Sequence, residues 1–294
     1  MEQEQVSFLA GDNTTLLSVK SYGRTRSVIL AKRGLTVLPD NLLDSVSEEI
    51  TEAEDLDLSN NSLSDIGEEI HSICGQLRSL DISRNKFQVL PSIVPALCVN
   101  LKILFLQNNQ ISCLPPEFEL LTKLEELYLC HNKLTEFPPI AEMAHLSILD
   151  VSHNSITTID DNCLSHEYCI LEELYIGNNE LEEIPAAIGT FTNLLVLDLS
   201  NNRICEIPEC LDGLVSIREL YLQDNKIKRV PQTFTKLKKL TEFNLSSNVM
   251  SCPPTIVCKK GCTAILKYLE ELSLGPRDKQ ERKLSRQTAF SYVL

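Results

Sequence analysis

Apolar residues recur along most of this chain at a short, repeated spacing. The segment that starts at Leu171 reads LEELYIGNNELEEIP, and the segment that starts at Ile217 reads IRELYLQDNKIKRVP. Both fit the template L-x-x-L-x-L-x-x-N-x-L-x-x-L-P, in which alternate positions of a short stretch are apolar. This alternation predicts a short β-strand with one buried and one solvent-facing side, followed by a turn.

The template fits ten consecutive units of the chain. Its fourth, sixth and eleventh positions are apolar in every unit, and Pro occupies the fifteenth position in eight of them. Such repetition predicts a solenoid in which neighbouring units cover each other's apolar faces. The units start at Thr25, Ala53, Leu77, Leu101, Leu124, Leu146, Leu171, Leu194, Ile217 and Leu240.

Nine of the ten units carry Asn at the ninth position of the template. An Asn amide both donates and accepts hydrogen bonds, so it can satisfy backbone groups that the turn leaves unpaired. We therefore predict a ladder of stacked, buried Asn side chains with a structural role. Its members are Asn61, Asn85, Asn109, Asn132, Asn154, Asn179, Asn202, Asn225 and Asn248.

Both ends of the repeat array are predicted to be capped. Residues Thr14–Tyr22 fit a short helix that ends at Gly23, and the stretch CTAILKYLEEL fits a helix with Thr263 as its N-cap and Ile265, Leu269 and Leu272 on its apolar face. The tail that follows carries a net charge of +3, against −17 for the rest of the chain. The predicted organisation is a cap segment over 1–24, a solenoid over 25–254, a capping helix over 255–275 and a mobile basic tail over 276–294.

The pattern from Thr25 to Pro254 resembles the leucine-rich repeat family, in its intracellular class with about 23 residues per repeat. The segments LLSVKSYGRTRSVILAKRGLTVLP and PPTIVCKKGCTAILKYLEEL resemble the Ras-group repeat class, which includes leucine-rich repeat-containing protein 40. The resemblance implies an α/β fold, a horseshoe-shaped solenoid with a concave parallel sheet and helical caps.

Composition narrows the possible functions and locations. The chain has 27 Lys and Arg against 41 Asp and Glu, a net charge of −14, which argues against nucleic-acid binding. No apolar run approaches the roughly 18 residues of a membrane-spanning helix, and the first residues lack the pattern of a secretory signal. Eleven Cys, an odd number, fit reduced thiols. We therefore expect a cytoplasmic protein, with a nuclear location as the open alternative.

The third and fifth template positions face the concave side and are not fixed by the repeat. Aromatic side chains there can anchor a partner, while carboxylates select basic residues. In the alternative interpretation, these residues are common fillings of the template, and Asp at the strand centre serves only solubility and spacing. The predicted partner-binding residues are Phe105, Tyr128, Tyr175, Tyr221, Asp150, Asp198, Glu126, Glu173 and Glu219.

Catalytic and metal-binding patterns are weak in this sequence. Adjacent Cys130 and His131 point to opposite faces of a strand, which does not favour a nucleophile–base pair. Cys163, His166 and Cys169 offer three ligands where a structural zinc site needs four. There is no glycine-rich phosphate loop. We expect no catalytic residue, metal, cofactor or small-molecule substrate.

The sequence therefore predicts a monomeric, non-catalytic protein–protein interaction module, a scaffold or adaptor whose partner has a basic or amphipathic surface. The alternative is a regulatory subunit in a phosphatase or small GTPase pathway, which would change the activity of its partner. The sequence does not separate the two. Two weak motifs in the tail, a basophilic kinase spacing at Ser285 and an apolar end at Tyr292–Leu294, leave modification or capture of the tail open.

Overall fold

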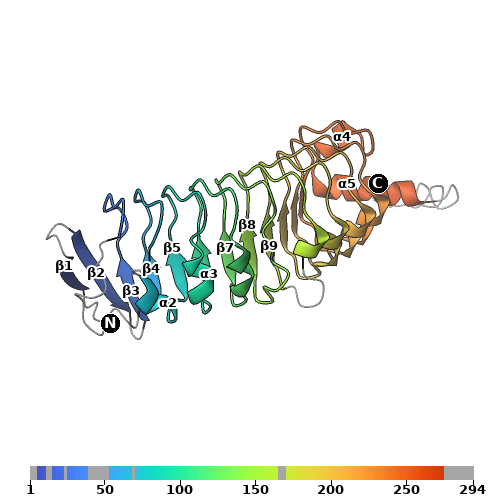
Figure 1. Cartoon of the computed structure of the whole chain (residues 1–294). Coiled ribbons are helices and arrows are strands. Elements are labelled where there is room, and N and C mark those ends of the chain that lie inside the picture. Colours follow the sequence, from blue (N-terminus) through green and yellow to red (C-terminus); the bar gives the residue numbers. More distant parts are fainter. Residues whose placement is uncertain are drawn as a thin grey trace, which may run out of the picture.

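The computed structural model describes residues 5–10, 15–22, 25–38, 53–67, 70–164 and 170–274. Their strands form one sheet of 12 strands in chain order, so each strand pairs with its sequence neighbours (Figure 1). Strands β3 to β12 pair in parallel. They are β3 (Thr25–Ile29), β4 (Asp55–Asp57), β5 (Ser79–Asp81), β6 (Ile103–Phe105), β7 (Glu126–Tyr128), β8 (Ile148–Asp150), β9 (Glu173–Tyr175), β10 (Val196–Asp198), β11 (Glu219–Tyr221) and β12 (Glu242–Asn244).

Each repeat strand has a buried centre between two more exposed residues. In β9 the central Leu174 is buried, while Glu173 and Tyr175 are half-buried. The strands from β4 on occupy the third to fifth template positions, one residue earlier than the apolar L-x-L pattern predicted. The fold confirms the predicted leucine-rich solenoid, because the fourth-position residues of successive units stack into one continuous core.

Short helices cover the side of the core opposite the sheet. The five-residue helices on this side from η2 on follow a Pro residue, whose fixed φ suits the start of the return path. Phe118, Phe191 and Phe234 are buried in this layer and seal the core. The elements are α2 (His71–Cys74), α3 (Ile93–Leu97), η2 (Pro116–Leu120), η3 (Asp161–Cys163), η4 (Ala186–Thr190), η5 (Glu209–Gly213) and η6 (Gln232–Lys236).

The N-terminal end of the sheet carries a β-hairpin, so the helix predicted over Thr14–Tyr22 is wrong. Strand β2 (Thr15–Tyr22) pairs antiparallel with both β1 (Gln5–Ala10) and β3. Residues 17–20 read Leu-Ser-Val-Lys, an apolar–polar alternation with the period of a strand. A strand here also pairs the backbone edge of β3, which a helix would leave open. Thr14 and Gly23 lie outside the described residues.

Two helices close the C-terminal end (Figure 1), α4 (Thr255–Cys258) and α5 (Cys262–Ser273). The N-cap of α5 is Gly261 rather than the predicted Thr263, because its φ of 86° lets the chain reverse sharply between the two helices. Ile265 and Leu269 are buried as expected, but Leu272 is 44% exposed. The predicted stop at Gly275 and the basic tail over 276–294 lie outside the described residues.

The ninth-position Asn residues share one set of hydrogen bonds. Asn179 Nδ2 donates to the carbonyl oxygens of Val151 and Ile176, both at 3.0 Å, and its Oδ1 accepts from the Ile156 N–H at 3.0 Å. Each Asn thus joins the sixth positions of two neighbouring units and the eleventh position of the preceding one. Asn179 is buried, whereas Asn109 and Asn132 are half-buried. The full set is Asn61, Asn85, Asn109, Asn132, Asn154, Asn179, Asn202, Asn225 and Asn248.

Candidate protein-binding surface

Strands β7 to β11 present two rows of half-buried side chains on the face of the sheet away from the helices. We call these ten residues the checkerboard patch. The third-position row is Glu126, Ile148, Glu173, Val196 and Glu219, and the fifth-position row is Tyr128, Asp150, Tyr175, Asp198 and Tyr221.

The strand register makes acidic and apolar residues alternate in both directions across this patch. Asp150 lies directly opposite Tyr128 on one side and Tyr175 on the other, and Asp198 lies between Tyr175 and Tyr221. In the third-position row, Ile148 and Val196 alternate with the Glu residues. The pattern of the patch therefore repeats every two strands rather than every strand. The sequence prediction omitted these two apolar residues, although the third-position column contains them.

Each Tyr of the patch is tied to the Glu two residues before it. The hydroxyl of Tyr128 donates to Glu126 Oε2 over 2.9 Å, and the hydroxyl of Tyr175 donates to Glu173 Oε2 over 2.8 Å. Burial, followed by this hydrogen bond, raises the pKa of Tyr175 well above its usual value. The rings are thus half-buried, and their hydroxyls are engaged.

The third pair, Tyr221 and Glu219, has the same geometry, with 2.9 Å between the hydroxyl and Glu219 Oε2. The hydrogen bond to Glu219, followed by burial, raises the pKa of Tyr221 to about 12. The hydroxyl therefore stays a donor at neutral pH. All three rings are held by the same local contact, so the patch is ordered before any partner binds.

Each Asp of the patch uses one oxygen for a local turn. Asp150 Oδ1 accepts the Ser152 N–H over 2.9 Å and the Ser152 hydroxyl over 2.6 Å, and Asp198 Oδ1 accepts the Ser200 N–H over 2.8 Å. The same contact occurs outside the patch, at Asp57 and Asp81. One oxygen of each Asp is therefore engaged in the turn of its own unit. Within the described part of the chain, Oδ2 of Asp198 accepts no hydrogen bond.

A glycine supports one of the two Asp residues. A Cβ placed on buried Gly177 would lie 3.1 Å from Asp198 Oδ2, so the carboxylate rests close to the backbone of the preceding unit. The equivalent neighbour of Asp150 is Cys130, whose pKa is raised to about 12 by burial and by the Asp150 carboxylate. The sequence analysis missed Gly177, although LYIGNN is the unit that has Gly at the seventh position.

Aromatic contacts border the patch on two sides. Phe105 stacks on Tyr128, with 5.0 Å between ring centroids and 9° between ring planes. His131 stacks on His153 over 4.0 Å at the turn that follows β7 and β8. The pKa of His153 is lowered by burial and then by the charge of His131, while Asp150 and Asp198 oppose this effect.

The described residues contain no group of three or more His, Cys, Asp or Glu side chains placed to hold a metal ion. Of the three candidate ligands considered from the sequence, Cys163 is half-buried, and His166 and Cys169 lie outside the described residues. The thiol of Cys130 lies beside Asp150 rather than beside a base that could activate it.

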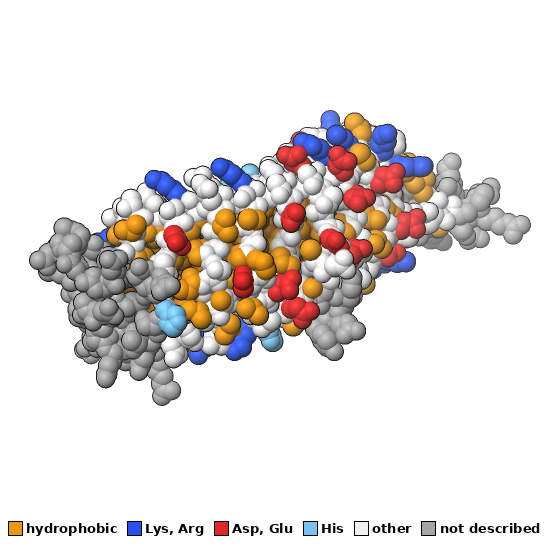
Figure 2. Space-filling view, in the orientation of Figure 1, with side chains coloured by type: hydrophobic (Ala, Val, Ile, Leu, Met, Phe, Trp, Pro, Cys, Tyr) orange, Lys and Arg blue, Asp and Glu red, His pale blue; other side chains and the backbone are white. Residues whose placement is uncertain are grey.

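The carboxylates of the patch have no basic partner among the residues that the structure describes. The ion pairs there join Arg78 to Glu54, Lys102 to Glu125, Arg203 to Glu180 and Lys236 to Asp212, all outside the patch. Figure 2 shows Asp and Glu side chains spread over the C-terminal half of the visible face, with many Lys and Arg along its upper edge. The two charges are thus partly separated on the surface.

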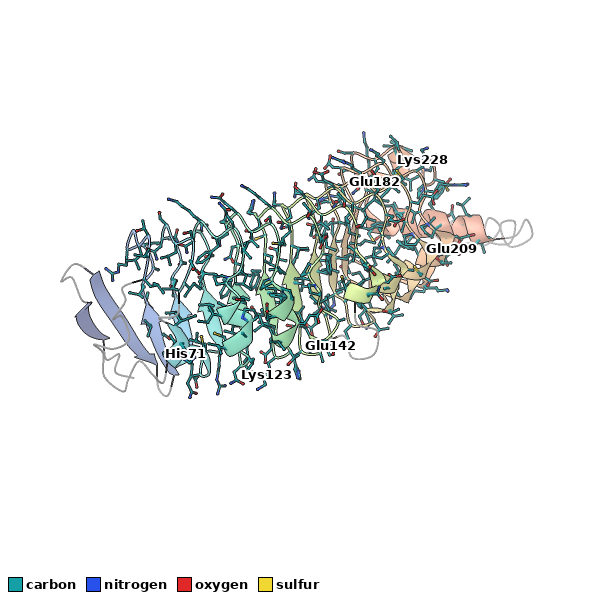
Figure 3. All side chains as sticks on the ribbon, viewed as in Figure 1. His71, Lys123, Glu142, Glu182, Glu209 and Lys228 are labelled. Carbon is teal, nitrogen blue, oxygen red and sulfur yellow. The ribbon has the colours of Figure 1, made fainter. Side chains whose placement is uncertain are left out.

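A separate hollow of about 900 Å³ lies near the C-terminal cap. Lys228, Glu209, Val249 and Leu272 are among the residues that line it, so its wall mixes both charges with apolar surface. Lys228 and Glu182 lie along one long edge of the molecule, opposite His71, Lys123 and Glu142 (Figure 3). The hollow shares no lining residue with the checkerboard patch.

Comparison with known proteins identifies the class. The family model described as Leucine rich repeat matches residues 75–134 and 169–227, and a second, described as Leucine Rich repeats (2 copies), matches residues 122–164. The chain is a leucine-rich repeat protein, a class whose members act as protein-binding modules. No helix in the described ranges has the length and apolar character needed to cross a membrane.

Individual relatives resemble only part of the chain or share only part of their own length with it. The Protein phosphatase 1 regulatory inhibitor subunit PPP1R7 homolog of Arabidopsis thaliana is 35% identical over 82 residues, which is 28% of this chain and 24% of that protein. A leucine-rich repeat protein of Leptospira interrogans matches with a TM-score of 0.66 and 32% identity, over 73% of this chain and 55% of that one. The ectodomain of the Arabidopsis thaliana receptor kinase GASSHO1/SCHENGEN3, in complex with CASPARIAN STRIP INTEGRITY FACTOR 2, matches with a TM-score of 0.59 and 28% identity, over 70% of this chain and 26% of that one.

Proposed function

We propose that this protein is a scaffold or adaptor that binds a basic segment of a partner protein on its checkerboard patch. The observation that supports this proposal is the set of five carboxylates that alternate with aromatic and aliphatic side chains on one face. They have no basic partner within the described residues.

The chemistry of the patch favours Arg and Lys. Their charged heads can pair with a carboxylate such as Asp198, while their apolar stems and the cation itself contact the faces of Tyr175 and Tyr221. Charges of one sign on a face also speed the encounter with an oppositely charged partner, over a range of about 8–10 Å at physiological salt. Raising the salt concentration should therefore slow association.

Affinity capture with the full chain tests this proposal. The double variant Tyr128→Ala/Tyr175→Ala removes two anchors, and we expect it to lose partners that the unmodified chain retains, at a cost of roughly 2 kcal/mol or more in binding. Asp150→Asn/Asp198→Asn should weaken the same capture, because it removes charge and keeps side-chain size. Both variants are first checked for unchanged circular dichroism.

A matched control changes two exposed apolar side chains on the helical side, Leu120→Ala/Val215→Ala, which are 50% and 53% exposed in the parent. We expect this control to capture the same partners as the parent chain. If the patch variants capture them unchanged and the control loses them, the binding surface is on the helical side, and the proposal is wrong.

The second candidate function is that of a regulatory subunit, which the similarity to the phosphatase 1 regulatory subunit homolog favours. The two functions differ in their effect on turnover, since an adaptor leaves the activity of its partner unchanged. Titration of the full chain into protein phosphatase 1 with a phosphopeptide substrate distinguishes them. A saturable change in phosphatase rate supports the regulatory function, and an unchanged rate supports the adaptor.

The proposal also covers the subfamily, the oligomeric state and the cellular compartment. The protein is proposed to be a member of the intracellular, Ras-group class of leucine-rich repeat proteins and to act as a monomer in the cytoplasm. Light scattering coupled to size-exclusion chromatography checks the monomeric state, and imaging of a fluorescent fusion checks the compartment. A stable dimer or a secreted product would contradict this part of the proposal.

A further inference from the structure

The checkerboard patch has a spacing that selects the conformation of its ligand. Asp150 and Asp198 stand on strands β8 and β10, with Tyr175 on the strand between them. Neighbouring strands lie about 4.8 Å apart, so the two Asp positions are separated by about 9.6 Å along the sheet. The rings of Phe105 and Tyr128, which lie opposite each other on neighbouring strands of the same row, are 5.0 Å apart between centroids, close to this strand spacing.

We infer that the patch binds a polyproline-II segment whose basic residues are three positions apart, one over Asp150 and one over Asp198. This inference rests on the proposed function and names the class of ligand that this surface accepts. A polyproline-II helix has three residues per turn and rises about 3.1 Å per residue. Residues i and i+3 therefore face the same side at about 9.3 Å, close to the separation of the two carboxylates.

Other peptide conformations fit this spacing less well. A β-strand places i and i+2 on one face at about 6.6 Å and i and i+4 at about 13 Å, and neither distance matches. An α-helix places i and i+7 on one face about 10.5 Å apart, which is farther from about 9.6 Å than the polyproline-II distance of about 9.3 Å. Of these conformations, polyproline II has the spacing between same-face residues that is closest to the separation of the two Asp positions.

The residues between the two carboxylates fit the rest of such a segment. Tyr175 lies midway between Asp150 and Asp198, and its ring is held by the hydrogen bond to Glu173. A held aromatic ring is the surface on which Pro-rich segments dock. Each basic residue would lie over an Asp flanked by two Tyr rings, so it gains an ion pair and contact with ring faces.

The two carboxylate sites differ in access. Asp198 Oδ2 lies over Gly177, which has no side chain to cover it, whereas Asp150 has the Cys130 thiol beside it. We therefore expect the basic residue over Asp198 to make the stronger contact. Asp198→Asn should then weaken binding more than Asp150→Asn.

The chain itself shows that these substitutions fit the fold. Asn244 occupies the equivalent position on β12, where its Oδ1 accepts the Ser246 N–H over 3.0 Å and the Ser246 hydroxyl over 2.8 Å. An Asn at position 150 or 198 can make the same contacts, so each variant removes the charge and keeps the turn. Asp81→Asn is the matched control, because Asp81 has the same contact with Ser83 outside the patch.

Fluorescence anisotropy with the full chain tests the inference. The probes are labelled peptides of equal length and charge in a Pro/Ala background, with two Arg residues spaced by two, three, four or seven positions. We expect the spacing of three to bind about tenfold more tightly than two or four, the effect of adding a second anchored contact. Asp150→Asn/Asp198→Asn should remove this preference, and Asp81→Asn should keep it.

Several outcomes overturn the inference. Equal affinity for all spacings, tightest binding at a spacing of seven, absence of binding by every peptide, or a preference that survives the double Asn variant each contradicts it. If partner capture still depends on Tyr128 and Tyr175 while the spacing has no effect, only the inference fails. If capture is independent of the patch, the proposed function fails as well.

Discussion

Gly177 and Asp198 lie close together in neighbouring units, such that a Cβ on Gly177 would be 3.1 Å from Asp198 Oδ2 and 3.0 Å from Ser200 Oγ. Gly177, the seventh residue of the preceding unit, has no side chain and leaves room for the Asp198 carboxylate beside the backbone. Adding a side chain at position 177 tests this relationship directly.

We predict that Gly177→Ala displaces the Asp198 carboxylate but keeps the fold. The atoms that a new Cβ would meet are ends of side chains, which can move by a few tenths of an ångström. Gly189→Ala is the comparison, because a Cβ there would lie 2.3 Å from the backbone oxygen of Cys210, which cannot move freely. We expect less than about 1 kcal/mol of destabilisation for Gly177→Ala and about 1–3 kcal/mol for Gly189→Ala. Urea denaturation measures both, and equal losses would contradict the contact geometry.

The second prediction concerns the Asn ladder. Asn179→Ala removes a side chain that makes three hydrogen bonds of 3.0 Å to backbone groups, two in the preceding unit and one in its own. The loss leaves buried carbonyl and N–H groups unpaired, at a cost of about 1–3 kcal/mol. Asn248 has the same contacts but is half-buried in the last unit, so water can replace part of them and the cost should be smaller.

Thermal or urea unfolding of the two Asn variants gives the comparison, and Gln88→Ala, at an exposed position, serves as the neutral control. We expect the order Asn179, Asn248, Gln88 in the loss of stability. If Asn179→Ala unfolds at the same temperature and urea concentration as the parent chain, the ladder contributes nothing to stability at that site.

The repeat template predicts most of the fold because its physical causes are local. An apolar L-x-L pattern followed by Asn specifies a strand and a turn, and the backbone partners of Asn179 follow from the stacking of units. The same reasoning fails for Thr15–Tyr22, which forms β2. That segment is short enough to fit a helix or a strand, and the open edge of β3, a tertiary feature, decides between them.

The sequence predicts only part of the checkerboard patch. The columns of Tyr and Asp follow from the period, so their alternation is visible in the letters. The hydrogen bond from Tyr175 to Glu173 and the contact between Gly177 and Asp198 depend on side-chain rotamers and on packing between units. Neither follows from spacing, which explains why the sequence predicted neither contact.

The third prediction is a pH dependence at the patch. The pKa of Tyr221 is raised to about 12 by its hydrogen bond to Glu219, followed by burial, against about 10 for Tyr in an unfolded chain. A raised pKa favours the protonated form in the folded state. The stability it contributes is complete below about pH 10 and is lost as the pH rises toward 12.

Glu219→Gln removes the charge that opposes tyrosinate formation, so it should lower the pKa of Tyr221. The ultraviolet absorbance of tyrosinate, followed during an alkaline titration of the folded chain, measures the change. Glu182→Gln, an exposed site outside the patch, is the control and should leave the titration curve unchanged. A curve that is also unchanged for Glu219→Gln would show that the hydrogen bond does not control this hydroxyl.

The last prediction concerns the thiol beside Asp150. The pKa of Cys130 is raised to about 12, first by burial and then by the nearby charge and hydrogen bonding of the Asp150 carboxylate. Because the thiolate is the reactive form, Cys130 should react slowly with a maleimide at neutral pH, more slowly than the exposed Cys113 and Cys205. Asp150→Asn removes the negative charge, so the pKa of Cys130 should fall and its modification should become faster. Asp198→Asn, two strands from β8, is the matched control and should leave the rate at Cys130 unchanged. Peptide-resolved mass spectrometry over a time course measures each site separately. An unchanged rate at Cys130 in Asp150→Asn would mean that burial alone protects the thiol, and that the carboxylate is oriented away from it toward solvent.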